Sequence, residues 1–203
     1  NNHLVLIAKN HLGYKNLMKI STIAHTEGFY YRPRIGKETL IKYKEGLIAL
    51  SSCSKGEVGQ FLINGQYESA KKAAQWYQEL FGEDNYYLEI QRHENDKYFD
   101  QTKDQKILSR LREFQKNEDL LVDGIIKLSR ELGVPLAATN DVHYLKQSDA
   151  FAQDVLVCVS TGKFVSDIDR LRYVDTPTFH LRTPEEMEKL FPEVPDALKN
   201  TLK

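Results

Sequence analysis

The chain has 203 residues, of which 41% are hydrophobic and 28% are charged. This length suffices for one domain or one and a half, and no apolar run approaches the roughly 18–20 residues of a membrane span, which excludes a membrane protein. The chain has 28 Lys and Arg against 29 Asp and Glu, so any contact with nucleic acid must come from a local patch rather than from a strongly basic surface.

The chain contains two cysteines, Cys53 and Cys158. Two are too few for the disulfide framework of a small secreted protein. The sequence does not begin with a basic segment followed by an apolar stretch, the pattern that predicts a signal peptide. We therefore expect a cytoplasmic protein with free thiols. Because the first residue is Asn and strand character begins at His3, we interpret the sequence as a piece of a longer protein.

Short apolar runs bounded by turn residues alternate with segments of helical periodicity. In chain order, the pattern predicts a strand at 3–8, helices at 14–27 and 37–44, a strand at 46–51, a helix at 67–81, a strand at 86–90, a helix at 108–132 and a strand at 134–139. Gly82 and Gly133 end the last two of these helices. Alternation of this kind predicts parallel βα units, in a barrel or an open sheet.

The remaining segments are assigned by composition and capping. Residues 92–104 are polar without periodicity and predict a surface loop. Glu89 within the preceding strand is expected to face solvent, and its alternative role is to accept a hydrogen bond from a metal ligand. In the helix at 108–132, the residues expected to be buried are Leu120, Ile125, Leu128 and Leu132. After a helix at 148–159, Thr183 is expected to cap a further helix that begins with proline and two glutamates.

The stretch AATNDVHYL ends a predicted strand with a carboxylate and an imidazole two residues apart. In an extended segment Asp141 and His143 point to the same face, so both can reach one small target. Zn²⁺ and Mn²⁺ accept such groups, and catalytic groups of parallel βα folds collect where strands end. The alternative is an Asx turn followed by an ordinary loop histidine.

Two further candidate ligands lie near the ends of other predicted strands. Cys53 follows the strand at 46–51, and its alternative role is a small buried thiol beside a turn. His3 stands at the start of its strand rather than its end, so it is equally consistent with a surface residue. Cys158 is expected in the core. No phosphate-binding loop, dinucleotide glycine motif, HExxH motif or nucleophile elbow is present, which excludes several common enzyme classes.

Several segments together resemble a known family. They are HLVLIAKNHLGYKNLMKIST, EGFYYRPRIGKETL, GLIALSSCSKGEV, WYQELFGEDNYYLEI, GVPLAATNDVHYL, DVLVCVSTGK and FHLRTPEEMEKLFPEVPDAL. In this order they resemble the amino-terminal region of the alpha subunits of bacterial DNA polymerase III, the C-family replicative polymerases. That region is the polymerase and histidinol phosphatase (PHP) domain, a distorted (β/α)7 barrel with metal ions at its strand ends.

The resemblance implies a fold and a ligand set. The fold is α/β, a partial PHP-type barrel with parallel strands that lacks its first strands. Residues 1–147 are expected to form the carboxyl-terminal part of the barrel, and 148–203 the end of the domain with a helical continuation toward the polymerase core. His3, Cys53, Asp141 and His143 match metal-ligand positions for Zn²⁺ or Mn²⁺. The other ligands of the family, including an HxH motif, are expected before residue 1.

The resemblance also implies activities and partners for a complete protein. The complete subunit is expected to perform DNA-directed DNA synthesis with Mg²⁺ at a separate polymerase site, in contact with DNA, a proofreading exonuclease and a sliding clamp. The PHP metal cluster is expected either to support 3′–5′ exonuclease or phosphoesterase chemistry or to have a structural role. The alternative is a free-standing, metal-dependent phosphoesterase of the PHP superfamily. The piece itself is expected to be inactive.

Overall fold

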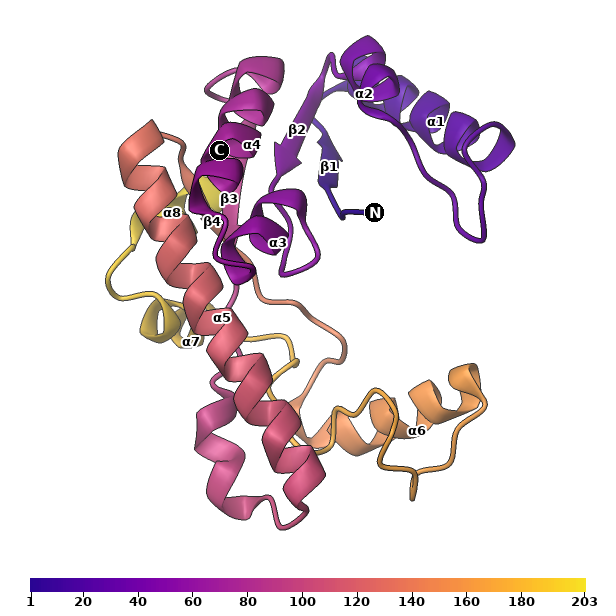
Figure 1. Ribbon diagram of the computed structural model, residues 1–203, viewed down its shortest axis with the longest axis vertical. Coiled ribbons are helices and arrows are strands. Elements are labelled where there is room, and N and C mark those ends of the chain that lie inside the picture. Colours follow the sequence, from indigo (N-terminus) through magenta and orange to yellow (C-terminus); the bar gives the residue numbers. More distant parts are fainter. The chain divides into compact units, whose positions relative to one another are not determined.

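The computed structural model describes residues 1–203, which form two compact units. Unit 1 contains Asn1–Glu89 and Gly124–Ala137, and unit 2 contains Ile90–Asp123 and Ala138–Lys203 (Figure 1). No helix is both long enough and apolar enough to cross a membrane.

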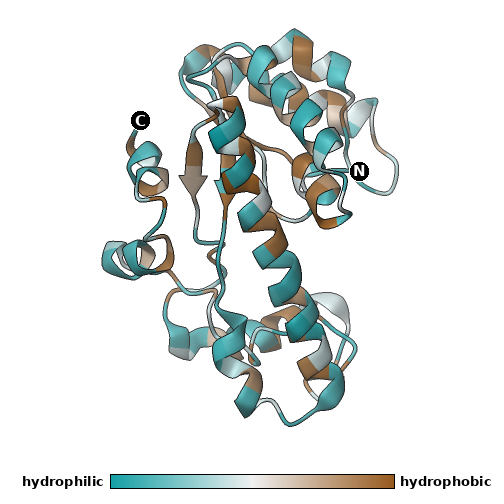
Figure 2. Ribbon diagram, turned by 60° about the vertical axis from the view of Figure 1, so that its left-hand side comes forward, coloured by the Kyte–Doolittle hydropathy of each residue, from teal (hydrophilic) through white to brown (hydrophobic).

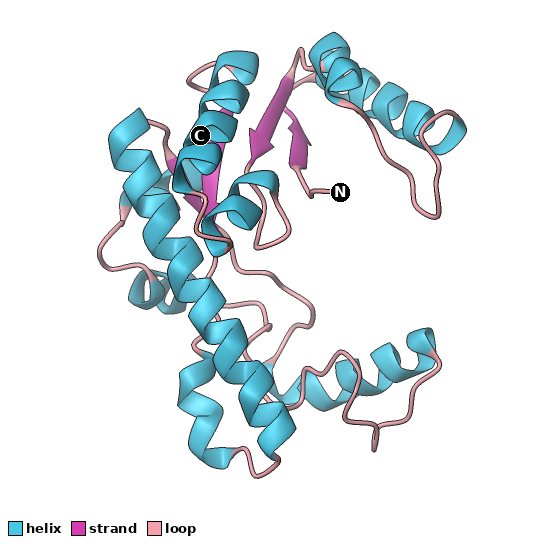
Figure 3. Cartoon of the chain, viewed as in Figure 1, coloured by secondary structure: helices cyan, strands magenta, loops and turns pink.

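A four-stranded sheet in the order β1-β2-β3-β4 lies almost wholly in unit 1. Its strands are β1 (Val5–Ala8), β2 (Leu47–Leu50), β3 (Tyr86–Ile90) and β4 (Leu136–Ala138). The helices are α1 (His11–Thr26), α2 (Lys37–Tyr43), α3 (Glu57–Ile63), α4 (Tyr67–Phe81), α5 (Gln105–Leu132), α6 (Ala150–Thr161), α7 (Pro184–Leu190) and α8 (Asp196–Lys199). Figure 3 shows these helices and strands, and the prediction of an α/β chain is confirmed.

The sheet is mixed rather than wholly parallel. β2 and β3 run parallel, with Ala49 opposite Tyr86. The amide of Leu88 in β3 donates to the carbonyl of Pro135, the residue before β4, at 2.9 Å. β1 and β2 run antiparallel, with Val5 opposite Leu50. The expectation of parallel strands throughout is therefore wrong for β1.

The close approach of two backbone segments explains the direction of β1. The amide of Lys9, after β1, donates to the carbonyl of Gly46, before β2, at 2.8 Å. A Cβ atom on Gly13, in the first turn of α1, would lie 1.8 Å from the same carbonyl. The segment that contains α1 and α2 thus leaves β1 and reaches β2 at the same end of the sheet. β2 therefore runs in the direction opposite to β1 (Figure 1).

Strand β3 forms the centre of the core. All its residues are buried, because both faces of the strand are covered. The ring of Tyr86 stacks on Tyr77 of α4 with 5.5 Å between centroids. Glu89 is only 5% exposed, so the prediction that it faces solvent is wrong, and its amide donates to the hydroxyl of Ser51 at 2.8 Å.

Helix α5 shows polar and apolar residues in alternating bands along its length (Figure 2). Ile125 and Leu128 are fully buried, as predicted, and Leu132 is partly buried. Leu120 is 45% exposed, and the neighbouring Leu121 is buried instead. The periodicity thus locates the helix correctly but sets the buried stripe one residue too early at this turn, because packing partners decide which flank of an amphipathic helix is covered.

Unit 2 contains the segment predicted as a surface loop. Part of that segment is a 3₁₀ helix at Asn95–Gln101, and both His93 and Asn95 are buried. The prediction of a surface loop is therefore wrong for these two residues. Cys158 is buried as expected, and Thr183 caps α7 by accepting a hydrogen bond from the amide of Glu186.

Candidate metal centre

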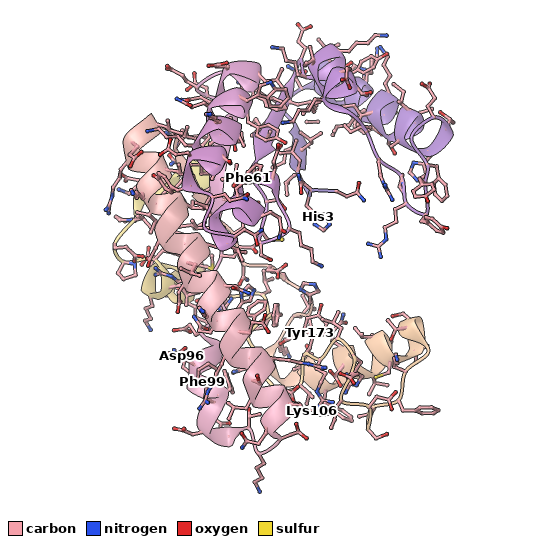
Figure 4. All side chains as sticks on the ribbon, in the orientation of Figure 1. His3, Phe61, Asp96, Phe99, Lys106 and Tyr173 are labelled. Carbon is pink, nitrogen blue, oxygen red and sulfur yellow. The ribbon has the colours of Figure 1, made fainter.

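In unit 1, His3 lies beside the turn that follows β2. The amide of His3 donates to the carbonyl of Lys55 at 2.8 Å, and the amide of Gly56 closes the turn by donating to the carbonyl of Cys53 at 2.9 Å. Because β1 is antiparallel to β2, the first residue of β1 lies level with the last residue of β2, at the same end of the sheet. The position of His3 at the start of its strand, labelled in Figure 4, therefore does not separate it from Cys53.

The turn that carries Cys53 is tightly constrained. Ser52 has a left-handed backbone with φ of 67°, and its hydroxyl donates to the Cys53 sulfur at 3.9 Å. A Cβ atom on Gly56 would lie 2.1 Å from the carbonyl oxygen of Ser51, so no other residue fits there without backbone movement. Cys53 is half-buried and forms no disulfide, which keeps its thiol available as a ligand.

In unit 2, a hydrogen-bonded turn follows β4. The side chain of Arg182 donates to Asn140 Oδ1 at 2.6 Å, and Asn140 Nδ2 donates to the carbonyl of His180 at 3.0 Å. Asp141 has φ of 52°, so the segment is not extended as the sequence predicted. The left-handed turn itself, which Asp tolerates better than most residues, brings Asp141 Oδ1 to 3.8 Å from His143 Nδ1.

The ring of His143 is held in one orientation. Its Nδ1 makes a 2.9 Å hydrogen bond with the carbonyl of Asp141, and its backbone amide donates to the carbonyl of Phe179 at 2.8 Å. The ring packs against Tyr173, labelled in Figure 4, and Phe179, with centroid distances of 4.8 and 5.5 Å. A carbonyl acceptor places the proton on Nδ1 and leaves the lone pair of Nε2 for a metal, the usual arrangement of a histidine ligand.

A buried histidine that the sequence did not single out contacts this turn. His93 is 3% exposed, its Nδ1 bonds Glu118 Oε2, and its Nε2 lies 3.3 Å from Asp141 Oδ2. Burial lowers the pKa of His93, but the hydrogen bonds and charges of Asp141 and Glu118 raise the pKa more, and the net direction is upward. A sequence signal was available, because His93 follows the end of β3 as Asp141 follows the end of β4.

The four predicted ligands form two pairs, His3 with Cys53 in unit 1 and Asp141 with His143 in unit 2. The structure contains no group of three or more His, Cys, Asp or Glu side chains arranged to hold a metal ion. That the two pairs share one site therefore stays a prediction.

Comparison with known proteins shows two similarities. The PHP domain pattern matches residues 1–93. The chain is 44% identical over 201 residues to the DNA polymerase III subunit alpha of Borreliella burgdorferi, covering 99% of this chain and 16% of the relative. Over nearly its whole length the chain is similar to part of the DNA polymerase III alpha subunits, and residues 1–93 are similar to the PHP domain. The relative in Treponema pallidum is 41% identical over 201 residues, and that in Helicobacter pylori strain 26695 is 42% identical over 209 residues.

The DNA polymerase III alpha relatives are much longer than this chain. The match with the Treponema pallidum relative includes 99% of this chain, and the match with the Helicobacter pylori relative includes 98%. Each match includes only 15% of the relative. The similarity also continues past residue 93, where the PHP pattern ends, through nearly the whole chain.

Proposed function

We propose that the chain is part of the alpha subunit of a replicative DNA polymerase III, and that the complete subunit performs DNA-directed DNA synthesis. The observation that supports this function is identity of 41–44% to DNA polymerase III alpha subunits over nearly the whole chain. A free-standing phosphoesterase would account for the PHP pattern at 1–93 but not for the continued similarity. The nucleotidyl transfer itself is assigned to a Mg²⁺ site outside residues 1–203.

We further propose that this region contributes to a Zn²⁺ or Mn²⁺ cluster. The available donors fit these ions: Zn²⁺ and Mn²⁺ accept the kinds of group present, one thiol, one carboxylate and two imidazoles, and the hydrogen bond at His143 Nδ1 leaves Nε2 for coordination. The constrained turns hold Cys53 and Asp141 in fixed backbone conformations, so little freedom is lost on binding. Bound metal would supply positive charge for phosphoester hydrolysis.

The wider assignments of the region follow from the family. We assign residues 1–147 to the carboxyl-terminal part of a distorted (β/α)7 barrel and 148–203 to the end of the domain and a helical continuation toward the polymerase core. DNA, a proofreading exonuclease and a sliding clamp are the proposed partners, and the cytoplasm is the proposed location.

The hydrolytic role is tested in the complete alpha subunit. Asp141→Ala is expected to lower the rate of 3′ end removal from primed DNA by more than about tenfold, because it deletes a ligand. The polymerisation rate serves as the internal control, and His11→Ala, at an exposed position of α1, as the matched variant. Equal nuclease rates in wild type and Asp141→Ala would assign the cluster a structural or docking role.

The 203-residue chain alone is expected to bind Zn²⁺ weakly or not at all. It supplies only four of the ligands proposed for the cluster, and a partial ligand set forfeits most of the coordination energy. Calorimetric titration of the chain with Zn²⁺ measures this. Tight binding that His143→Ala abolishes would contradict the prediction and show that these four residues suffice.

A further inference from the structure

Glu118 anchors the buried ring of His93 at two points. Glu118 Oε1 accepts from the backbone amide of His93 at 2.9 Å, while Oε2 bonds ring Nδ1. The ring is also packed between Phe179 and Phe114, with centroid distances of 4.5 and 5.5 Å. Glu118 itself is 7% exposed and lies on α5, so a helix fixes the position of the ring. His93 can change neither its rotamer nor its depth without breaking these contacts.

The opposite edge of the same ring faces the carboxylate of Asp141. His93 Nε2 lies 3.3 Å from Oδ2 of Asp141, and the other oxygen, Oδ1, lies 3.8 Å from Nδ1 of His143. The two carboxylate oxygens therefore have different neighbours: a buried imidazole on one side and a partly exposed imidazole on the other. All these residues belong to unit 2, so the arrangement does not depend on the placement of unit 1.

We propose that His93 is a positioning residue for Asp141. The inference rests on the proposed metal centre and adds residues that the ligand set does not contain. Glu118 holds the ring of His93, and the ion pair of ring Nε2 with Oδ2 of Asp141 restrains one carboxylate oxygen and thereby biases the direction of the other before any metal binds. Partners of this kind orient ligands in metal sites, and their loss costs roughly 10–100-fold in metal affinity.

The competing role for His93 is simple packing of the core against Phe179. Two substitutions separate the roles, because glutamine can place an amide nitrogen near the position of Nε2, and asparagine near that of Nδ1. Positioning therefore predicts that His93→Gln keeps the contact with Asp141, while His93→Asn keeps only the contact with Glu118. If His93 only packs against Phe179, His93→Gln and His93→Asn are expected to have equal effects on Zn²⁺ affinity, since both substitutions remove the ring.

The test measures Zn²⁺ affinity of the complete alpha subunit by calorimetry, with thermal unfolding of each variant recorded separately. His93→Asn is expected to weaken Zn²⁺ binding roughly 10–100-fold, and His93→Gln to recover most of this loss. Glu118→Gln, which keeps side-chain size but leaves one acceptor oxygen for the two donors of His93 and removes the negative charge, is expected to weaken binding in the same direction. His25→Asn, the same substitution at an exposed position of α1, is expected to bind as the wild type does.

Unchanged Zn²⁺ affinity in folded His93→Asn and Glu118→Gln would overturn the proposal, and so would equal losses in His93→Asn and His93→Gln. If His93→Asn fails to fold, the Glu118→Gln affinity decides between the two roles. A wild-type subunit that binds no Zn²⁺ would instead refute the metal centre of the proposed function, and the positioning role with it. Zn²⁺ binding by the wild-type subunit therefore separates the two outcomes: it is retained if only the positioning role of His93 is wrong, and absent if the metal centre is wrong.

Discussion

Replacement of His143 by alanine in the complete alpha subunit is expected to weaken Zn²⁺ binding by more than the roughly 100-fold that loss of an outer partner can cost. The ring is already oriented, because its Nδ1 bonds the carbonyl of Asp141 and its faces pack against Tyr173 and Phe179. Alanine removes both the donor atom and this preorganisation. Competition calorimetry against a chelator of known affinity measures the change.

The control for this experiment is His11→Ala, which removes an exposed imidazole at the first position of α1. Its Zn²⁺ affinity should equal that of the wild type. A His143→Ala subunit that retains wild-type affinity would remove His143 from the ligand set. Because the preceding turn is held by Asn140 and Arg182, we expect the variant to fold normally.

Asp154→Ala is expected to lower the free energy of unfolding of the 203-residue chain by about 3–5 kcal/mol. Asp154 and Arg170 form a fully buried ion pair at 2.5 Å, and Asp154 Oδ1 also accepts from the amide of Tyr173 at 2.8 Å. Alanine would leave the guanidinium buried without its counter-charge and the amide without its acceptor. Urea unfolding of both chains measures the difference, and Asp123→Ala, at an exposed position of α5, should stay within about 0.5 kcal/mol.

The effect of Asp154 should depend on pH in one direction. Burial raises the pKa of Asp154, but the hydrogen bonds from Arg170 and Tyr173 and the charge of Arg170 lower it more, so the net pKa is below the ordinary value. A carboxyl group with a lowered pKa in the folded state stabilises the fold above its unfolded pKa of about 3.9, and this contribution is lost as pH falls through the folded value. The difference between wild type and Asp154→Ala should therefore be constant near neutrality and shrink below about pH 4. A difference that grows on acidification would contradict this account.

Local sequence patterns were sufficient for the elements whose causes are local. The helix at Tyr67–Phe81 and the strand at Tyr86–Ile90 have the predicted bounds, because their periodicity and the glycine after the helix are properties of neighbouring residues. The cap of α7 also follows from Thr183, Pro184 and Glu186 alone. The helix at Glu57–Ile63 was not predicted, since seven residues carry too little periodicity to mark it.

Contacts between distant segments decided the remainder. The direction of β1 depends on the meeting of Lys9 with Gly46, which no local pattern encodes. Burial of Glu89 depends on what covers the second face of β3, and the predicted alternation of the strand assumed that this face was open to solvent. The approach of Asp141 to His143 also has a different origin from the predicted one, a left-handed turn rather than an extended segment.

The sequence by itself determined the α/β class, most of the helices and strands, and the types of ligand that the chain can offer. Only the tertiary structure placed His3 beside the Cys53 turn and brought His93 between Glu118 and Asp141. The physical reason is the range of the interactions: periodicity and caps act over a few residues, whereas the partners of His93 lie 25 and 48 positions away along the chain. Such pairings arise only when the strands and helices pack.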